Sequence, residues 1–304
     1  MYDTIIIGAG PAGMTSAIYT ARRKLKTLLL SKNVGGQMIW SSDVENYTGF
    51  TMVTGADLTL KFEEHLESLK DDLELKLDTE VIGIEKNITS FAVTDKKGEV
   101  YYSKTVIIAS GKDPRHLGVS GEQEFYGKGV AVCATCDAPL YKQKNVAVVG
   151  GGNSALDAII ALSKVAKQVY VINVNEELSG ESVVKEKVLN LSNVKIFKQT
   201  KVTKIEGDKQ VTGIGIVPFG RDEQVLQVSG VFVEIGYEPS IGFADLVEKN
   251  DHNEIKVNSD LSTNIEGVFA AGDVNDDWGE QIIIAAGEGA KAAMAVSKYL
   301  AKLK

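Results

Sequence analysis

The chemistry of this chain is expected to centre on its two cysteines, Cys133 and Cys136, which are separated by two residues. Two thiols at this spacing can close a small disulfide ring, and such motifs often lower one thiol pKa so that it becomes a nucleophile. A structural metal site would need about four ligands. The chain has no second cysteine pair and its three histidines are scattered. Redox chemistry is therefore favoured, and no metal is expected.

The residue that follows the second cysteine directly is Asp137. A carboxyl beside a dithiol is well placed to move protons to and from the sulfurs. The same residue could also simply close a turn or cap a helix. Cys133, Cys136 and Asp137 together form the candidate catalytic group.

Two glycine-rich turns are the second chemical feature. Gly8-Ala9-Gly10-Pro11-Ala12-Gly13 follows the β-branched run 4–7, and Gly150-Gly151-Gly152-Asn153-Ser154-Ala155 follows the apolar run 145–149. After a strand, such glycines permit a tight turn and close approach to a pyrophosphate, whose charge the next helix N-terminus stabilises. One such motif is a weak signal. Two in the same context, 150 − 8 = 142 residues apart, predict two nucleotide-binding halves.

Neither turn is followed by the acidic residue that the dinucleotide fingerprint places at the end of the next strand. Ser31 stands there in the first copy and Asn173 in the second. A hydroxyl or an amide can still bond a ribose. The departure therefore bears on which dinucleotide binds and leaves the fold prediction intact.

The elements that must position these motifs form two α/β halves. Helices are expected over 14–23, 156–164 and 281–303, strands over 4–7, 27–30, 105–111, 145–149, 168–172, 231–236 and 267–273, and small antiparallel sheets within 80–93 and 194–217. Strands that alternate with helices indicate parallel sheets. The pattern predicts an α/β fold with two Rossmann-like domains.

The last segments complete the first half if the second half is an insertion. Asp113-Pro114 and Glu238-Pro239 interrupt the pattern, so we place the boundaries near residues 115 and 242. One domain then comprises residues 1–115 and 242–304. The inserted domain comprises residues 116–241 and carries the cysteine pair.

Composition excludes several classes of protein. The 304 residues exceed the usual size of one domain, and 44% hydrophobic with 24% charged residues is ordinary for a globular protein. A net charge of −8 disfavours a nucleic-acid partner. No run approaches the roughly 18 apolar residues of a membrane span, and no signal-peptide pattern precedes the first strand. We expect a cytoplasmic protein with no membrane partner.

Together the motifs resemble those of the low-molecular-weight thioredoxin reductases, which are flavoprotein disulfide reductases, over nearly the whole chain. The resemblance rests on Gly8-Ala9-Gly10-Pro11-Ala12-Gly13, Gly35-Gly36-Gln37, Glu45-Asn46-Tyr47, Ala109-Ser110-Gly111, Cys133-Ala134-Thr135-Cys136-Asp137, Ala271-Gly272-Asp273 and Gln281-Ile282-Ile283. It implies FAD in the first domain, a pyridine nucleotide in the inserted one, and usually a homodimer. The implied partner is a thioredoxin-like or glutaredoxin-like protein.

The resemblance also implies roles for single residues. Cys136 would lie against the isoalloxazine ring, Cys133 would attack the disulfide of the protein substrate, and Asp137 would serve the dithiol as acid and base. Asp273 would bond the ribityl or pyrophosphate part of FAD. The implied FAD contacts also include Gln37, Asn46 and Gln281 near the ring, and Gly8, Gly10, Pro11, Ala12, Gly13, Ser31, Gly36, Ala109, Gly111, Gly272 and Ile282. The implied pyridine-nucleotide contacts are Gly150, Gly152, Asn153, Ser154 and Asn173.

The segment after the second nucleotide strand bears on the electron donor. NADPH-dependent members carry a His-Arg-Arg stretch and a further Arg there, because guanidinium groups hold the 2′-phosphate. Residues 173–181 instead contain the carboxylates of Glu176, Glu177 and Glu181 and no Lys or Arg. NADPH is therefore disfavoured and NADH is expected. The alternative is a ferredoxin-dependent flavin thioredoxin reductase with a non-functional NAD(P) site, against which the intact turn at 150–155 argues.

Three further features follow from the resemblance. The strings 137–140 and 281–289 are similar to the NADH-using flavoprotein of alkyl hydroperoxide reductase, although those relatives would show Glu at Asn173. Glu280 stands where relatives often carry Arg or Lys. The family's inserted domain rotates, which predicts hinges near 114–117 and 236–241. A rival interpretation is a flavin-bound redox sensor that regulates a partner without turnover.

Overall fold

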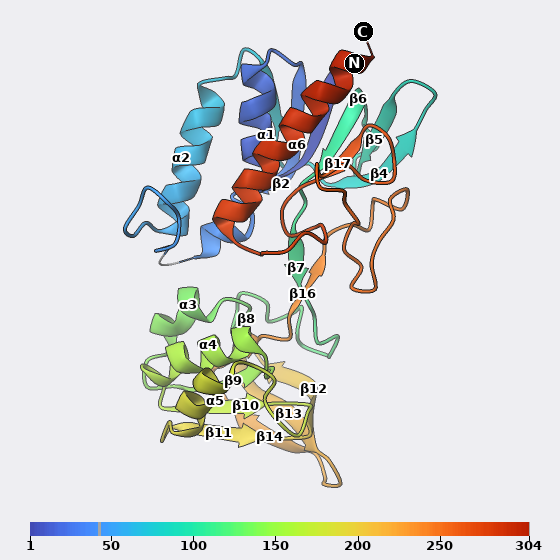
Figure 1. Ribbon diagram of the computed structural model, residues 1–304. Helices are drawn as coiled ribbons and strands as arrows, with labels where there is room; N and C mark the ends of the chain where they lie inside the picture. The colour runs from blue at the N-terminus through green and yellow to red at the C-terminus, as the bar shows by residue number, and fades with distance from the viewer. Residues whose placement is uncertain (42–43, 304) are drawn as a thin grey trace. The chain divides into compact units, whose positions relative to one another are not determined.

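The structure is a computed structural model that describes residues 1–41 and 44–303, and the side chains of Trp40, Thr135 and Cys136 lie outside this description. The chain separates into a first unit, Met1–Asp113 with Glu238–Lys304, and an inserted unit, Pro114–Tyr237 (Figure 1). Each unit has a sheet with a core of parallel strands and helices packed on it. The predicted α/β fold class is confirmed.

The first unit is built on a seven-stranded sheet of order β3-β2-β1-β6-β5-β4, with β17 also pairing with β6. Its strands are β1 (Tyr2–Ala9), β2 (Thr27–Val34), β3 (Leu73–Lys76), β4 (Val81–Lys86), β5 (Phe91–Asp95), β6 (Val100–Ile108) and β17 (Val268–Ala270). β5 pairs with β6 in antiparallel register. The prediction of a separate small sheet within 80–93 is therefore wrong, because β4 and β5 extend the main sheet.

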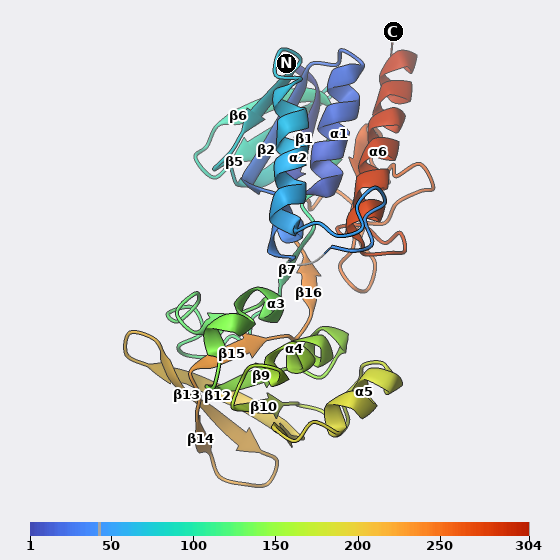
Figure 2. The ribbon, with the colours of Figure 1, turned by 90° about the vertical axis from the view of Figure 1, so that its left-hand side faces the viewer.

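Three long helices cover one face of this sheet, with α1 lying between α2 and α6 (Figures 1 and 2). The helical elements are α1 (Pro11–Arg22), the short 3-10 helix η1 (Gly36–Trp40), α2 (Gly55–Glu67) and α6 (Ile282–Lys302). Gly289 brings the α6 backbone close to α1, since a Cβ there would lie 2.1 Å from the carbonyl oxygen of Ala12. The Ser16 hydroxyl donates to the Gly289 carbonyl oxygen at 3.0 Å.

Strand β1 is buried on both faces, as a β-branched run in a parallel sheet should be. Ile6 packs into the core under α1 and α6, whereas Ile5 and Ile7 pack into the core on the opposite face. Ile241 belongs to that opposite core and is 1% exposed. Its neighbour Ser240 donates its backbone N–H to the Gly111 carbonyl oxygen at 3.0 Å. These contacts explain why the first unit resumes at Glu238 and not at residue 242.

The inserted unit contains a parallel sheet of order β11-β10-β9-β15-β8 and an antiparallel sheet of order β12-β13-β14. The strands are β8 (Val130–Ala131), β9 (Asn145–Val149), β10 (Gln168–Ile172), β11 (Val194–Phe197), β12 (Thr200–Gly207), β13 (Val211–Pro218), β14 (Gln224–Gln227) and β15 (Gly230–Val233). β11 pairs in parallel with β10. The prediction that the whole of 194–217 is antiparallel is therefore wrong for its first strand.

Alternation along β9 shows how this sheet is covered. Val146 and Val148 pack into the core with α4, while Ala147 and Val149 pack into the core with β12 and β13. The helical elements are α3 (Ala134–Asp137), the short 3-10 helix η2 (Ala138–Tyr141), α4 (Asn153–Ser163) and α5 (Ser182–Leu189). Among the described residues, none of the helices combines the length and the apolar character needed to cross a membrane.

The chain passes between the units in two short strands, β7 (Lys112–Pro114) and β16 (Tyr237–Pro239). The two strands form a two-stranded sheet. Within the inserted unit, Arg115 donates its backbone N–H to the Gly236 carbonyl oxygen at 2.9 Å. The linkers are therefore paired segments and not open loops.

Candidate active site

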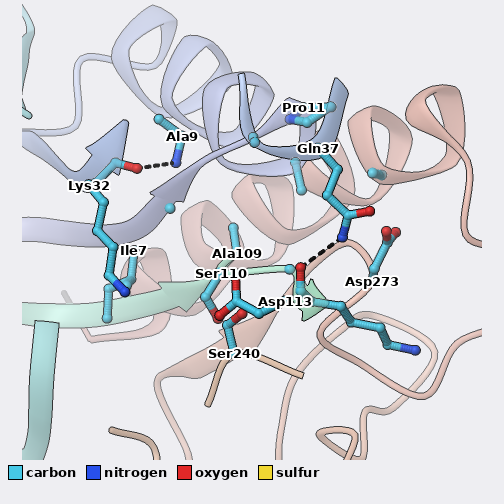
Figure 3. Close-up of a pocket in the computed structure, with 18 of the residues that line it drawn as sticks. Ile7, Ala9, Pro11, Lys32, Gln37, Ala109, Ser110, Asp113, Ser240 and Asp273 are labelled. Carbon is cyan, nitrogen blue, oxygen red and sulfur yellow. Dashed lines mark hydrogen bonds between the residues drawn. The ribbon is translucent and has the colours of Figure 1, made fainter. Parts of the chain in front are cut away.

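A cavity of about 840 Å³ opens in the first unit where β1, β2 and β6 end. Figure 3 shows Lys32 at one end, and Gln37 and Asp273 at the other. This volume lies in the upper part of the usual range for ligand sites, about 300–1,000 Å³. Most predicted FAD residues line it: Gly8, Gly10, Pro11, Ala12, Ser31, Gly36, Gln37, Asn46, Ala109, Gly111, Asp273, Gln281 and Ile282.

The first glycine-rich turn supplies an anion-binding wall. Gly8 has φ of +104°, and a Cβ there would lie 2.3 Å from the Ala109 carbonyl oxygen. Gly13 does not line the cavity but lies behind it, because a Cβ there would be 1.7 Å from the Gly8 carbonyl oxygen. Gly10 caps α1, whose first turn carries no acidic residue. The helix N-terminus can therefore hold a pyrophosphate.

Two hydroxyls indicate that the cavity receives a ligand. The Oγ atoms of Ser110 and Ser240 are buried and have no hydrogen-bond partner among the described residues. Both serines line the cavity (Figure 3). Buried polar groups are normally paired, so a polar ligand would satisfy them. The cavity thus suits FAD in its anion-binding turn and its unpaired hydroxyls, and its volume is typical of a ligand site.

The end of the cavity predicted for the flavin ring is held by amide contacts. Gln37 Nε2 donates to the Lys112 carbonyl oxygen at 2.7 Å (Figure 3). Asn46 Nδ2 donates to Gln281 Oε1 at 2.8 Å. The structure therefore brings these three predicted residues, Gln37, Asn46 and Gln281, to one cavity from segments far apart in the sequence.

Ser31, predicted at the ribose, has its hydroxyl engaged inside the fold. Its Oγ accepts the Ala9 backbone N–H at 3.0 Å and donates to the Asn33 carbonyl oxygen at 2.6 Å. This side chain ties the end of β2 to the glycine turn. A ribose hydroxyl could therefore bond Ser31 only by donating to its Oγ, because the hydroxyl proton of Ser31 is already donated to Asn33.

A charged group at the cavity accounts for the unusual residue at position 280. Lys112 is 10% exposed in its side chain, lies 2.7 Å from Glu254 Oε1 and also bonds Glu280. Relatives often carry a cation at this position, whereas here Glu280 pairs with the ammonium group of Lys112. Burial, and then the charge of Glu280, raise the pKa of Asp273 to about 6, while Lys112 opposes the rise. The sequence interpretation missed Lys112 and Glu254.

Glu288 on α6 is a further residue that sequence reasoning missed. It is 7% exposed, and its Oε2 accepts both the Gly272 backbone N–H and Asn275 Nδ2 at 2.7 Å. It thereby fixes the turn that presents Asp273, whereas Gly272 itself does not line the cavity. The available signal was an acid between two glycines, Gly287 and Gly289, in the otherwise apolar first part of the helix, 282–290.

The cysteine group lies in the inserted unit, around α3. Cys133 is disulfide-bonded and half-buried, and its carbonyl oxygen accepts the Asp137 backbone N–H at 3.2 Å. The side chain of Cys136 lies outside the described residues. Burial raises the pKa of the Asp137 carboxyl, so it holds its proton to higher pH than an exposed Asp. A disulfide beside such a carboxyl favours thiol–disulfide exchange.

The second glycine-rich turn repeats the geometry of the first. Gly150 has φ of +139°, and a Cβ there would lie 2.0 Å from the Glu234 carbonyl oxygen. Gly152 caps α4, whose first turn has no acidic residue. Ser154 hydrogen-bonds through its side chain to Glu234. The turn can receive a pyrophosphate as the first one can.

Two residues predicted at the pyridine nucleotide are used inside the fold. Asn173 is 3% exposed, and its Nδ2 donates to the carbonyl oxygens of Asn175 at 3.0 Å and Glu177 at 2.9 Å. Asn153 Oδ1 accepts the Glu181 backbone N–H at 2.8 Å. These bonds fasten the acidic segment 173–181 beside the glycine turn.

The same segment keeps its acidic character in the structure. The Ser179 backbone N–H donates to the Gly151 carbonyl oxygen at 2.8 Å, so the segment touches the turn. Lys198 lies 2.6 Å from Glu177 Oε1 and lowers the pKa of that carboxyl. Lys185 also lies near enough to lower this pKa. Two lysines do not offset the carboxylates of Glu176, Glu177 and Glu181, so a 2′-phosphate would meet a net negative surface.

Comparison with known proteins identifies the family. The model of the pyridine nucleotide-disulphide oxidoreductases matches residues 2–289. The chain belongs to this family. Membership implies FAD and a pyridine nucleotide as cofactors. The F component of alkyl hydroperoxide reductase from Staphylococcus epidermidis is 39% identical over 301 residues, which cover 98% of this chain and 59% of that protein. This pyridine nucleotide-disulphide oxidoreductase thus spans about three-fifths of the length of such relatives.

Solved structures define the branch of the family. Thioredoxin reductase from Lactococcus lactis is 31% identical with a TM-score of 0.85, and the match covers 99% of this chain and 100% of that one. A ferredoxin-flavin thioredoxin reductase from Clostridium acetobutylicum is 31% identical with a TM-score of 0.55, over 99% and 98% of the two chains. The resemblance to low-molecular-weight thioredoxin reductases is confirmed. The chain is thus similar to thioredoxin reductases over almost its whole length.

Proposed function

We propose that this protein reduces the disulfide of a thioredoxin-like or glutaredoxin-like protein, with NADH as donor, bound FAD, and the pair Cys133 and Cys136 as the redox-active disulfide. The observation that carries the proposal is the disulfide-bonded Cys133 directly before α3, beside a carboxyl of raised pKa, in a unit that also holds an intact nucleotide turn. The cavity of the first unit, which most of the predicted FAD residues line, supports it.

Bound FAD would supply the two-electron chemistry that links a nucleotide donor to a disulfide. The residues that would hold it are the α1 N-terminus for the pyrophosphate, Asp273 for the ribityl or pyrophosphate part, and Gln37 and Asn46 toward the ring. Ser110 and Ser240 offer two unpaired hydroxyls to it. Each of these residues lines the same cavity, so their task is to bind and orient the cofactor.

The reduced cysteine pair performs the exchange with the substrate. The Cys133 thiolate attacks one sulfur of the substrate disulfide, a mixed disulfide forms, and the other substrate sulfur leaves as a thiolate. Cys136 then attacks the Cys133 sulfur, which restores the enzyme disulfide and releases the second substrate thiolate. Asp137 moves protons to and from these sulfurs, a task to which its raised pKa is suited.

The charge beside the second turn supports NADH over NADPH. The acidic segment is bonded to the turn through Ser179 and Asn153, so its carboxylates stay near the position where a 2′-phosphate would bind. An adenosine ribose with two free hydroxyls brings no second charge there. Asn173 keeps its Oδ1 as a hydrogen-bond acceptor, since the bonds given above use its amide N–H groups.

The donor is tested by anaerobic reduction of the purified flavoprotein. NADH, NADPH and reduced ferredoxin are added separately while the visible absorption of the flavin is followed. We expect rapid bleaching with NADH and slow bleaching with NADPH. Rapid bleaching by NADPH alone would contradict the argument from the acidic segment, and a protein that does not bind FAD would contradict the whole proposal.

A second candidate is a ferredoxin-dependent reductase. It is favoured by the acidic segment in the nucleotide site and by the similarity to a ferredoxin-flavin thioredoxin reductase. Bleaching by reduced ferredoxin, with neither nucleotide active, would establish this candidate in place of the first. A homodimer stays a prediction that light scattering on the purified protein can test.

A further inference from the structure

The buried carboxyl of Glu234 has no part in the function proposed above. It stands at the end of β15, is 8% exposed, and donates its backbone N–H to the Val149 carbonyl oxygen at 2.8 Å. A carboxyl this buried is uncommon unless partners stabilise its charge. Its partners are therefore informative about its role.

Glu234 joins the two functional elements of the inserted unit. Its carboxylate accepts a hydrogen bond from the Ser154 side chain, on the first turn of α4, and another from the backbone N–H of Ala134. Ala134 is the first residue of α3 and directly follows Cys133. The Glu234 carboxylate thus bonds the first turns of two helices. One is α3, which follows Cys133 and is called the redox helix below, and the other is α4, which follows the second glycine-rich turn.

The surroundings of Glu234 bring its titration close to neutral pH. Burial raises its pKa to about 7, the bonds from Ser154 and Ala134 lower it, and the nearby charge of Asp157 on α4 raises it. Burial, and then the charges of Glu234 and Tyr126, raise the pKa of Tyr237 on β16.

The four-residue helix α3 carries its own acid, Asp137, which is the proposed proton carrier of the dithiol. Burial raises its pKa. Glu234 reaches the opposite end of the same helix, at Ala134. The two carboxyls therefore act on the redox helix from different ends.

We propose that Glu234 is a positioning residue for the redox helix, whose ionised carboxylate anchors the Ala134 amide and makes the neighbouring Cys133 thiol less acidic. The inference rests on the proposed redox role of Cys133. It follows from geometry: α3 has only four residues, so one charged hydrogen bond at its first amide is a large part of what holds it. A negative charge so near also disfavours a thiolate.

The test measures the alkylation rate of Cys133 by iodoacetamide between about pH 5.5 and 9. A Cys136→Ser background leaves Cys133 as the single thiol, and Cys133 is half-buried and so accessible in part. We expect an inflection near pH 7 in addition to that of the thiol. Glu234→Gln should abolish it and raise the rate at about pH 7.5 by roughly three- to tenfold, since a like charge is removed. An unchanged pH profile would overturn the proposal.

Two further variants keep Glu234 and so test the proposal even if Glu234→Gln does not fold. Asp157→Asn removes a like charge and should move the inflection to lower pH. Ser154→Ala removes a hydrogen bond to the ionised form and should move it to higher pH. Shifts in the same direction, or no shifts, would show that the inflection does not belong to Glu234. The assay uses neither donor nor protein substrate, so it can fail or succeed independently of the proposed function.

Discussion

At the scale of single residues, the titratable carboxyl of Asp273 lines the cavity that is proposed to bind FAD. Its folded pKa of about 6 lies above its ordinary 3.8. The stabilising contribution is therefore complete below pH 3.8 and is lost as the pH rises through about 6. We expect Asp273→Asn to raise the free energy of unfolding of the flavin-free protein by about 1–3 kcal/mol at pH 8 and by less at pH 5. Urea unfolding at the two pH values measures this.

The same substitution should weaken FAD binding, because the proposed contact to the ribityl or pyrophosphate part is altered. Stability and cofactor affinity would then change in opposite directions, as is common at binding sites. Equal stability of the variant and the wild type at both pH values would contradict the assigned pKa.

Lys112 is partly buried and forms ion pairs with Glu254 and Glu280. The two pairs should contribute unequally to the stability of the protein. Glu254 is 20% exposed and Glu280 60% exposed in their side chains. We expect Lys112→Met to destabilise the protein by about 1–3 kcal/mol, since it leaves a partly buried acid unpaired. A double-mutant cycle should give a larger coupling with Glu254→Gln, about 1–2 kcal/mol, than with Glu280→Gln, below about 1 kcal/mol. The reverse order would show that burial does not govern the pair.

At the scale of elements, two glycines of the first turn are expected to serve different purposes, Gly13 in folding and Gly10 in FAD binding. A Cβ at Gly13 would lie 1.7 Å from the Gly8 carbonyl oxygen, whereas a Cβ at Gly10 would meet only the Gly36 Cα at 4.0 Å. We expect Gly13→Ala to prevent folding or cost about 3 kcal/mol or more. Gly10→Ala should stay within about 1 kcal/mol of the wild type yet lose FAD affinity at least about tenfold, because its methyl group would point toward the cofactor.

Thermal unfolding and flavin titration measure the two effects. Gly152→Ala is the matched control in the inserted unit, since its Cβ would meet only Ser179 Oγ at 3.9 Å. It should keep FAD and slow reduction by NADH. Loss of FAD from Gly152→Ala, or retention of FAD by Gly10→Ala, would show that the turns were assigned to the wrong ligands.

The elements predicted best from the sequence are those with a strong local signal. Both strand–turn–helix units are where the β-branched runs and glycines place them, because the turn chemistry is local. The pairing of β5 with β6 and of β11 with β10 was not predicted, since register depends on partners distant in the chain. Lys112 and Glu280 lie 168 residues apart, and only the folded chain brings them together. Glu234 and Glu288 each lie in an apolar run, and their hydrogen-bond partners come from other elements. Their roles were therefore not predicted from the sequence.

At the scale of the whole molecule, the two linkers are expected to act as hinges. Gly236 has φ of +92° with no atom within 4 Å of a Cβ placed there, so Gly236→Ala adds strain without a clash. The left-handed conformation costs an L-residue about 1–2 kcal/mol. We expect the variant to lower turnover several-fold while FAD content and the thiol count after chemical reduction stay unchanged.

Gly220→Ala is the control for this prediction. Gly220 has φ of +69° and likewise no atom within 4 Å of an added Cβ, but it lies between β13 and β14, away from the linkers. Its turnover should match the wild type. Equal losses in the two variants would mean that general strain, and not hinge motion, reduces activity.

The proposed path of electrons to the cysteine pair is tested most directly by counting thiols. The FAD-loaded protein is reduced anaerobically with one equivalent of NADH and alkylated, and the mass is measured. The account predicts two alkylated cysteines, Cys133 and Cys136, and none in FAD-free protein. A flavin that bleaches while both cysteines remain in a disulfide would contradict it.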